Sequence, residues 1–192
     1  MGKNISKDEG QLLLRIARDS ILKEFEKNHD ESVSIIPDTS RDILMESRGV
    51  FVSLHTKGNL KGCIGTIEPI KSLFEGVIDN AKHAAFHDTR FNPLTFEEFL
   101  DTKIEVSILT CPEKLEYKHG WDLISQIRPD IDGVIIRKNS RSATFLPQVW
   151  RQLKNHETFL GQLCLKAGLP LDEWKIGNLG VSTYQVQLFE EE

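Results

Sequence analysis

Three Ser/Thr-x-x-Glu patterns most strongly constrain how this chain can fold. They lie at Ser6–Glu9, Ser72–Glu75 and Thr95–Glu98. In such a pattern the hydroxyl and carboxylate side chains bind each other's backbone amides, so each pattern predicts the start of a helix. Apolar residues at helical spacing follow the first two patterns, and the third predicts a short helix.

Between the predicted helices the pattern changes to that of strands. A β-rich run at Val50–Leu54, a turn at Thr56–Asn59 and a second run at Leu60–Ile67 predict a β-hairpin. Apolar and polar side chains alternate over Lys103–Thr110, which predicts a further strand. We therefore expect an α+β fold, with a mixed, mainly antiparallel sheet and flanking helices.

The C-terminal half returns to the same kinds of element. Strand patterns at Val134–Arg137 and Ala143–Leu146 flank a polar turn. Residues Gln148–Ala167 are predicted to be largely helical, with Gly168 as the cap at the helix end. Alternation over Val181–Phe189 predicts a final strand.

The order hairpin, helix, strand thus occurs twice along the chain. A length of 192 residues is within the range of one domain, so we expect a single domain over residues 1–192. Element order alone leads to the hypothesis of a duplicated unit, with two lobes at about residues 1–110 and 111–192.

Composition and charge exclude several classes of protein. With 39% hydrophobic and 28% charged residues, the chain has globular rather than disordered composition. The formal net charge is -5 and the basic residues are scattered, so we expect no nucleic-acid surface. Arg128, Arg137, Lys138 and Arg141 are close in sequence and are interpreted as a solvated hairpin tip, with a local basic pocket as the alternative.

The N-terminal stretch and the cysteines bear on cellular location. Residues Met1–Gln11 are polar and lack the apolar core of a signal peptide. No stretch approaches the roughly 18 apolar residues of a membrane span, so we expect a cytoplasmic protein with no membrane partner. Cys63, Cys111 and Cys164 are odd in number and far apart, which predicts reduced thiols rather than a zinc or redox pair.

The least ordinary stretch is Leu60–Thr66, where Gly62 and Gly65 interrupt a predicted strand. Glycines there indicate that something approaches the backbone closely: a ligand, a bulge or a neighbouring segment. Cys63 lies between them, and is either a small buried hydrophobic residue or a thiol presented for chemistry.

This stretch also carries a resemblance to a known family. Arg48–Val52 and Lys61–Thr66 are similar to the hallmark of the AMMECR-one domain family, named for a gene of the Alport, midface hypoplasia and elliptocytosis chromosomal region. Lys61 stands where the family usually has arginine, and lysine lacks the planar fork of a bidentate anion contact. Further matching runs follow in family order at Pro69, Asp88–Phe91, Glu105–Ser107, Phe145–Val149 and Leu163–Leu169.

The resemblance implies a compact α+β fold, a cleft near the Gly-Cys-Ile-Gly motif and no established catalytic activity. It also implies a link to Memo-like proteins of dioxygenase-related fold and to radical S-adenosylmethionine proteins as partners. Nothing in the sequence indicates a cofactor. We expect the ligand or partner cleft to include Lys61, Gly62, Cys63, Ile64, Gly65, Thr66, Asp88, Arg90, Glu105, Ser107 and Gln148.

Several of these residues have a structural interpretation beside the functional one. Asp88 and Arg90 either form an ion pair that fixes a loop, or Arg90 recognises a carboxylate or phosphate while Asp88 orients it. Glu105 and Ser107 line the same surface as the cysteine motif if that strand is their neighbour, and are otherwise solvated sheet residues. Gln148 is expected near a helix start, where it can face the cleft.

His83 and His87 lie on one face of the second predicted helix and are weak candidates for metal ligands. Residue 84 is alanine, so the glutamate base of the helical zinc motif is absent, and no third ligand follows. Exposed or hydrogen-bonded helix histidines are the simpler interpretation.

Two functions are consistent with these features. The first is an accessory or binding module whose cleft holds a small anionic ligand or a partner segment. The second is an enzyme that uses Cys63 as nucleophile on a small-molecule or modified-macromolecule substrate. In that case Lys61 or a histidine activates the thiol, and backbone amides near the glycines stabilise an oxyanion. No catalytic base near Cys63 is identifiable, which favours the binding module.

Overall fold

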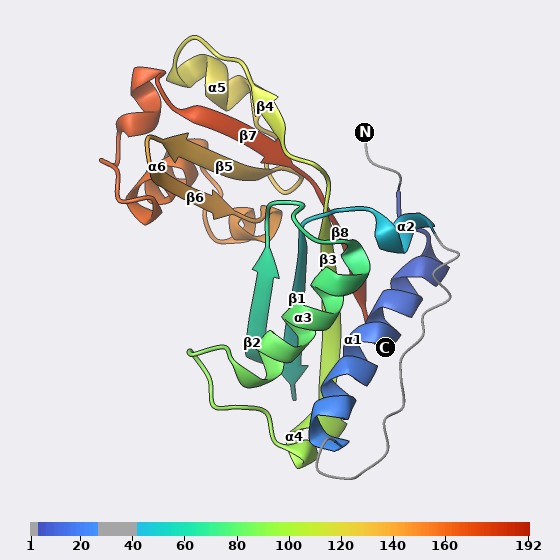
Figure 1. Ribbon diagram of the computed structural model, residues 1–192. Coiled ribbons are helices and arrows are strands. Elements are labelled where there is room, and N and C mark those ends of the chain that lie inside the picture. The colour runs from blue at the N-terminus through green and yellow to red at the C-terminus, as the bar shows by residue number, and fades with distance from the viewer. Residues whose placement is uncertain (1–3, 27–41) are drawn as a thin grey trace. The chain divides into compact units, whose positions relative to one another are not determined.

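The computed structural model describes residues 4–26 and 42–192 and divides into two compact units (Figure 1). Unit 1 comprises residues 1–111 and 187–192, and unit 2 comprises residues 112–186. Among the described residues, no helix combines the length and the apolar character that crossing a membrane requires.

Unit 1 is a four-stranded sheet with helices packed against one face. The strand order is β2-β1-β3-β8, and β1 is antiparallel to both of its neighbours. The strands are β1 (Val50–Thr56), β2 (Asn59–Thr66), β3 (Thr102–Leu109) and β8 (Val186–Glu190). The helices are α1 (Lys7–Glu26), α2 (Asp42–Met45), α3 (Leu73–Phe86) and α4 (Phe96–Leu100), of which α1 and α3 lie side by side over the sheet in Figure 1.

The three predicted capping boxes are confirmed at the starts of α1, α3 and α4. At the first, Ser6 Oγ accepts a hydrogen bond from the Glu9 amide at 3.3 Å, and Glu9 Oε2 accepts one from the Ser6 amide at 2.7 Å. The same reciprocal pair of bonds is present in the boxes that begin at Ser72 and Thr95. Local side-chain chemistry therefore decides where these helices begin.

The core of unit 1 determines which side chains of β1 are left on the opposite face. Val50, Val52 and Leu54 are fully buried and belong to the hydrophobic cluster shared with α1 and α3. Because successive side chains of a strand point to opposite faces, Phe51, Ser53 and the residues that alternate with them project from the face away from these helices.

Unit 2 is a second four-stranded sheet, in the order β4-β7-β5-β6. Trp150 and Trp174 are each 1% exposed and lie in its hydrophobic cluster. Its elements are β4 (Glu113–Leu115), α5 (Gly120–Gln126), β5 (Gly133–Lys138), β6 (Arg141–Phe145), the 3₁₀ helix η1 (Pro147–Arg151), α6 (His156–Lys166), the 3₁₀ helix η2 (Glu173–Ile176) and β7 (Gly180–Tyr184).

Residues Gln148–Ala167 are largely helical, as predicted, but the helical residues form two separate helices. A 3₁₀ helix that begins at Pro147 ends before α6 starts. Asn155 caps α6, because its Oδ1 accepts the amide of Glu157 at 2.8 Å and that of Thr158 at 3.3 Å. Apolar spacing runs through this break, so periodicity alone could not reveal it.

The end of α6 agrees with the sequence. Gly168 adopts a φ of +70°, the left-handed conformation that favours glycine. The amide of Leu169 binds the carbonyl of Cys164 and the amide of Gly168 binds that of Leu165, both at 2.9 Å. These two bonds form a Schellman motif, which confirms the predicted cap.

The single strand predicted over Val181–Phe189 is two strands in different sheets. β7 ends at Tyr184 and pairs with β4 and β5, whereas β8 begins at Val186 and belongs to the sheet of unit 1. The alternating pattern continues across the junction because both strands have two-residue periodicity.

Pairing follows the same order in both units. In unit 1 the β1–β2 hairpin is followed by α3 and by β3, which pairs antiparallel with β1. In unit 2 the β5–β6 hairpin is followed by α6 and by β7, which pairs antiparallel with β5. A duplicated origin for the two units stays a hypothesis.

Candidate functional site

The two glycines of the hallmark motif, Lys61–Thr66, lie against other parts of the protein. A Cβ atom added at Gly62 would lie 2.0 Å from the backbone oxygen of Ala84 in α3. One added at Gly65 would lie 2.2 Å from the ring of Phe51 in β1. A neighbouring segment therefore approaches the strand at both positions. The alternative of a bulge is also met beside Gly62, because the register of β1 and β2 shifts between Leu54 and His55.

Two side chains from the loop after α3 bind the backbone of Cys63. Asp88 Oδ2 accepts a hydrogen bond from the Cys63 amide at 2.9 Å, and Arg90 Nη2 donates one to the Cys63 carbonyl at 2.9 Å. Since β2 is an edge strand, these bonds replace those that a further strand would make. We call this arrangement the Asp–Arg clamp.

The clamp is held together by a bidentate ion pair. Arg90 Nε binds Asp88 Oδ1 at 2.9 Å and Arg90 Nη2 binds Asp88 Oδ2 at 2.6 Å. The Arg90 guanidinium, assisted by the backbone amides of Cys63 and Arg90, holds the pKa of Asp88 well below its usual range. The Asp88 side chain is 4% exposed and that of Arg90 is 57% exposed. The ion pair expected from the sequence is thus present. It fixes β2 at Cys63 as well as its own loop.

Three polar side chains align across the sheet on the face away from α1 and α3. Strand register places Ser53 opposite Cys63 on one side and opposite Glu105 on the other. Ser53 Oγ donates a hydrogen bond to Cys63 Sγ at 3.2 Å. We call Cys63, Ser53 and Glu105 the polar row.

The strand order decides how Glu105 relates to Cys63. The neighbour of β3 is β1, and not β2, which carries Cys63, so Glu105 is one strand further from Cys63 than direct pairing would put it. Glu105 nevertheless shares a surface with Cys63 because Ser53 bridges the two in register. Sequence reasoning missed Ser53, although its alternation with Val52 and Leu54 already assigns it to the polar face.

The carboxyl group of the row has an unusual environment. Burial raises the pKa of Glu105; the nearby charge of Glu190 reinforces this shift and that of His55 opposes it. The hydroxyl of Ser107, a buried residue, donates a long hydrogen bond of 3.5 Å to Glu105 Oε1. Glu105 therefore keeps its proton to a higher pH than an exposed glutamate does.

The other predicted cleft residues have different surroundings. Lys61 Nζ forms an ion pair with Glu98 Oε1 at 2.5 Å, Ile64 packs against the core of unit 1, and Thr66 is exposed. Gln148 lies in η1 of unit 2, and its buried Oε1 has no hydrogen-bond partner among the described residues. Its place in a cleft stays a prediction.

The histidine pair of α3 is exposed. The rings of His83 and His87 have their centroids 5.4 Å apart. In the described parts of the chain, no three or more His, Cys, Asp and Glu side chains gather into a group that could hold a metal ion. The two histidines thus have no third ligand there.

The basic residues of unit 2 are engaged separately. Arg128 Nη2 binds Asp132 Oδ1 at 2.7 Å, Lys138 pairs with Glu173, and Arg141 donates to the carbonyl of Gly168. Because these three cations have different partners, they do not converge on a common anion site.

The three cysteines, all free, differ in accessibility and provide an internal comparison of reactivity. Cys111 is exposed, Cys63 is intermediate and Cys164 is buried. Burial raises the pKa of the Cys164 thiol, which further lowers its reactivity. Under native conditions we expect iodoacetamide to alkylate Cys111 fastest, Cys63 more slowly and Cys164 only after unfolding.

Mass spectrometry of the three cysteine peptides after timed alkylation measures these rates in one sample. Alkylation in denaturant, where all three thiols are accessible, is the control. If Cys63 reacted faster than Cys111 below pH 7, the expected order would be wrong and an activated thiol would be indicated.

Comparison with known proteins extends these observations to relatives. The family model described as AMMECR1 matches residues 14–189. A protein of Methanothermobacter thermautotrophicus is 40% identical over 189 residues, covering 98% of this chain and 97% of that protein. Protein MK0488 of Methanopyrus kandleri is 39% identical over 200 residues, covering 100% of this chain and 93% of that protein.

A solved structure is similar over the same extent. The crystal structure of uncharacterized protein PH0010 from Pyrococcus horikoshii has a TM-score of 0.84 and 35% sequence identity. The match covers 98% of this chain and 94% of that one, so both units take part in it.

Proposed function

The chain belongs to the AMMECR1 family, and from this premise we propose that it is a cytoplasmic accessory or binding module that acts with Memo-like and radical S-adenosylmethionine proteins. Its binding surface is centred on the polar row beside the Gly-Cys-Ile-Gly motif. The observation that carries the proposal is the register that aligns Cys63, Ser53 and Glu105 across three strands.

The chemistry of the row favours a polar partner segment over a small anion. A thiol, a hydroxyl and a carboxyl with a raised pKa all take part in hydrogen bonds, and none of them is a cation. Of the nearby cations in the predicted cleft, Arg90 is tied to Asp88 and Lys61 to Glu98. Hydrogen-bond complementarity is therefore the main source of recognition in this proposal.

The Asp–Arg clamp supports binding by fixing the row in advance. Both backbone groups on the outer edge of Cys63 are hydrogen-bonded, so the strand that carries the thiol is held in place. A surface that is rigid before its partner arrives loses less conformational entropy on binding.

We expect Glu105→Gln to weaken partner binding about tenfold, because an amide keeps the shape of the carboxyl but changes its hydrogen-bonding groups. Purified Memo-like and radical S-adenosylmethionine proteins from the same organism are immobilised in turn, and biolayer interferometry measures the Kd of each variant. Glu113→Gln is the matched control, since Glu113 is an exposed glutamate on β4 of unit 2.

Wild type and Glu113→Gln should bind equally, and Cys63→Ser should fold and bind with at most a small loss, because no chemistry of the thiol is required. If neither partner binds the wild type, the partner assignment is wrong. If Glu105→Gln binds as tightly as Glu113→Gln, the polar row is not the binding surface.

A second function, with Cys63 as a nucleophile, is favoured by one observation. Glu105, with its raised pKa, lies in the same row and offers a proton donor or acceptor one strand from the Ser53 hydroxyl. The group that contacts the thiol is a hydroxyl, however, and not an imidazole or carboxylate that could take its proton. We therefore rank this function below the binding module, and the alkylation rates distinguish the two.

A further inference from the structure

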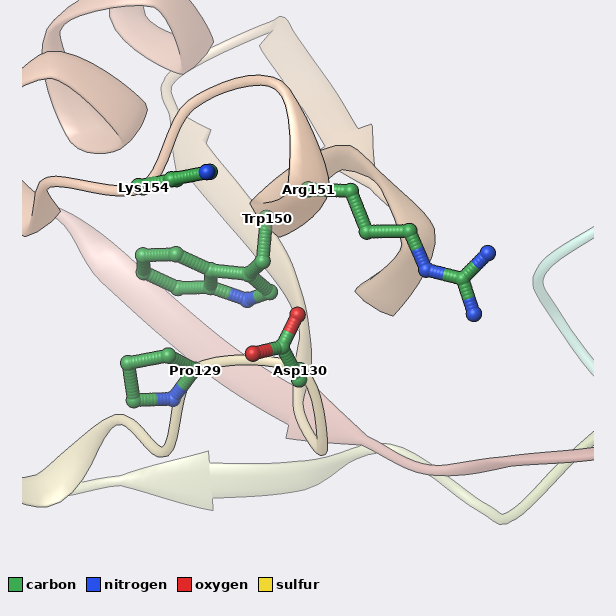
Figure 2. Close-up of a pocket in the computed structure, with 5 residues that line it drawn as sticks. All are labelled: Pro129, Asp130, Trp150, Arg151 and Lys154. Carbon is green, nitrogen blue, oxygen red and sulfur yellow. The ribbon is translucent and has the colours of Figure 1, made fainter.

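Unit 2 contains a pocket that plays no part in the proposed function. It has a volume of about 420 Å³ and is lined by Pro129, Asp130, Trp150, Arg151 and Lys154 (Figure 2). This volume is within the range of small-molecule sites, which combine an apolar wall with a few polar groups.

The walls of the pocket are fixed by interactions behind them. The amide and the guanidinium of Arg128 both bind the carboxylate of Asp132, at 2.9 and 2.7 Å, which closes the turn that carries Pro129 and Asp130. Trp150 Nε1 donates to the carbonyl of Asp132 at 2.9 Å and so ties this turn to η1. The pocket is thus formed without a ligand.

The indole is also fixed on the side of the core. Trp150 stacks on Phe159 with ring centroids 3.7 Å apart and an interplanar angle of 1°. His156 packs edge-on against the same indole at 5.1 Å. Since Trp150 is only 1% exposed, the pocket meets a small part of a rigid aromatic ring.

Asp130 adopts a backbone conformation that is uncommon for a residue with a side chain. Its φ is +62°, in the left-handed region, where asparagine and aspartate are the side chains best tolerated. Glycine would relieve the strain, but it would remove the carboxylate from the pocket wall. A strained residue that lines a pocket is a common sign of a functional site.

The charges around the pocket do not neutralise one another. In residues 4–26 and 42–192, the side chains of Asp130, Arg151 and Lys154 have no hydrogen-bond or ion-pair partner, although all three residues line one pocket. Figure 2 draws Lys154 above the indole of Trp150 and Asp130 below it, with the Arg151 side chain extending away from the ring. An unpaired cation and an unpaired carboxylate that line the same pocket match a ligand that carries both charges.

We propose that this pocket binds a small zwitterion of the amino-acid type. Its carboxylate lies towards Lys154, its ammonium group towards Asp130, and its apolar side chain against the ring of Pro129 and the small part of the Trp150 indole that meets the pocket. Arg151, at the rim, adds to the attraction for the carboxylate. The proposal concerns unit 2 alone and does not depend on the polar row.

Three related probes separate the contributions of the two charges. L-Phenylalanine carries both charges, 3-phenylpropanoate lacks the ammonium group, and 2-phenylethylamine lacks the carboxylate. The indole N–H signals of the three tryptophans report binding in ¹H–¹⁵N NMR titrations. We expect phenylalanine to shift the Trp150 signal in a saturable way, and each truncated probe to bind about tenfold more weakly because one charge-assisted hydrogen bond is lost.

Substitutions test which residue binds each charged group of the ligand. Asp130→Asn tolerates the left-handed backbone and should weaken phenylalanine binding about tenfold without affecting 3-phenylpropanoate. Lys154→Gln should weaken phenylalanine to a similar degree without affecting 2-phenylethylamine. Lys175→Gln is the matched control, because Lys175 lies 5.5 Å from the ring centroid of Trp174 but pairs with Asp172 outside this pocket.

The proposal is overturned if none of the probes shifts the Trp150 signal at millimolar concentration. It is equally overturned if Asp130→Asn and Lys154→Gln bind phenylalanine as wild type does. Unchanged indole signals in the ligand-free spectra establish that these variants are folded. Loss of Memo-like partner binding in Glu105→Gln has no bearing on these outcomes, so the two proposals can fail separately.

Discussion

Replacing Gly62 by alanine is expected to lower the free energy of unfolding by about 3 kcal/mol, at the upper end of the range for overpacked cores. The added Cβ would lie 2.0 Å from the backbone oxygen of Ala84 and 2.9 Å from its carbonyl carbon. Both atoms belong to the helix backbone, so no side-chain rotation relieves the clash, and α3 must move away from the sheet.

Urea unfolding followed by circular dichroism measures this loss. Gly180→Ala is the matched control, because Gly180 is also a strand glycine but its nearest neighbour to an added Cβ is 3.6 Å away. We expect this control to change stability by less than about 1 kcal/mol. Equal losses in the two variants would mean that close packing of β2 on α3 is not the reason for the glycine.

The second large effect is expected at the Asp–Arg clamp. Asp88→Asn should lower stability by about 2 kcal/mol at pH 7, because the charge-assisted bonds from Arg90 are lost. The loss should be smaller than that of a fully buried pair, since Arg90 is 57% exposed and solvent screens its charge.

The contribution of the Asp88–Arg90 ion pair to the stability of the folded protein should depend on pH. Arg90 lowers the pKa of Asp88 in the folded protein, so the unfolded chain, with a pKa of about 3.9, takes up the proton first as the pH falls. The stabilisation is therefore complete above about pH 5 and is lost progressively below pH 4. The difference in stability between wild type and Asp88→Asn should shrink in the same range.

Denaturant titrations from pH 7 to about pH 2 test this prediction. Asp101→Asn is the control, because Asp101 lies 3.7 Å from Lys57 in a pair whose side chains are 60% and 79% exposed. Such surface pairs contribute little, so its stability difference from wild type should stay below about 0.5 kcal/mol. A wild-type advantage over Asp88→Asn that persists unchanged to the lowest pH would rule out the ion pair as its source.

Part of the site is built from interactions between residues that are close in the sequence. The pair between Asp88 and Arg90 spans two residues, and its presence agrees with the structural interpretation of the sequence. The glycines indicated a close neighbour, although not which one. Sequence could not identify Ala84 as that neighbour, because α3 meets β2 only after the hairpin and the helix pack together.

Other features of the site could not be predicted because they depend on contacts between segments that are distant in the sequence. Ser53 joins Cys63 to Glu105 only because β1 lies between β2 and β3, and that order is a property of the whole sheet. The pocket in unit 2 likewise joins Pro129 and Asp130 to Trp150 through one bond to the carbonyl of Asp132. No periodicity within either segment indicates that they meet.

The sequence by itself determined the starts of α1, α3 and α4, the two hairpins, the C-cap at Gly168 and membership of the family. These features depend on hydrogen bonds between residues a few positions apart, or on the identity of whole motifs. Only the tertiary structure decided that Val181–Phe189 divides between two sheets, that the polar row forms, and that three unpaired charges surround one pocket. Those outcomes depend on packing between residues far apart in the chain, where local propensity contributes little and the burial of apolar surface selects the arrangement.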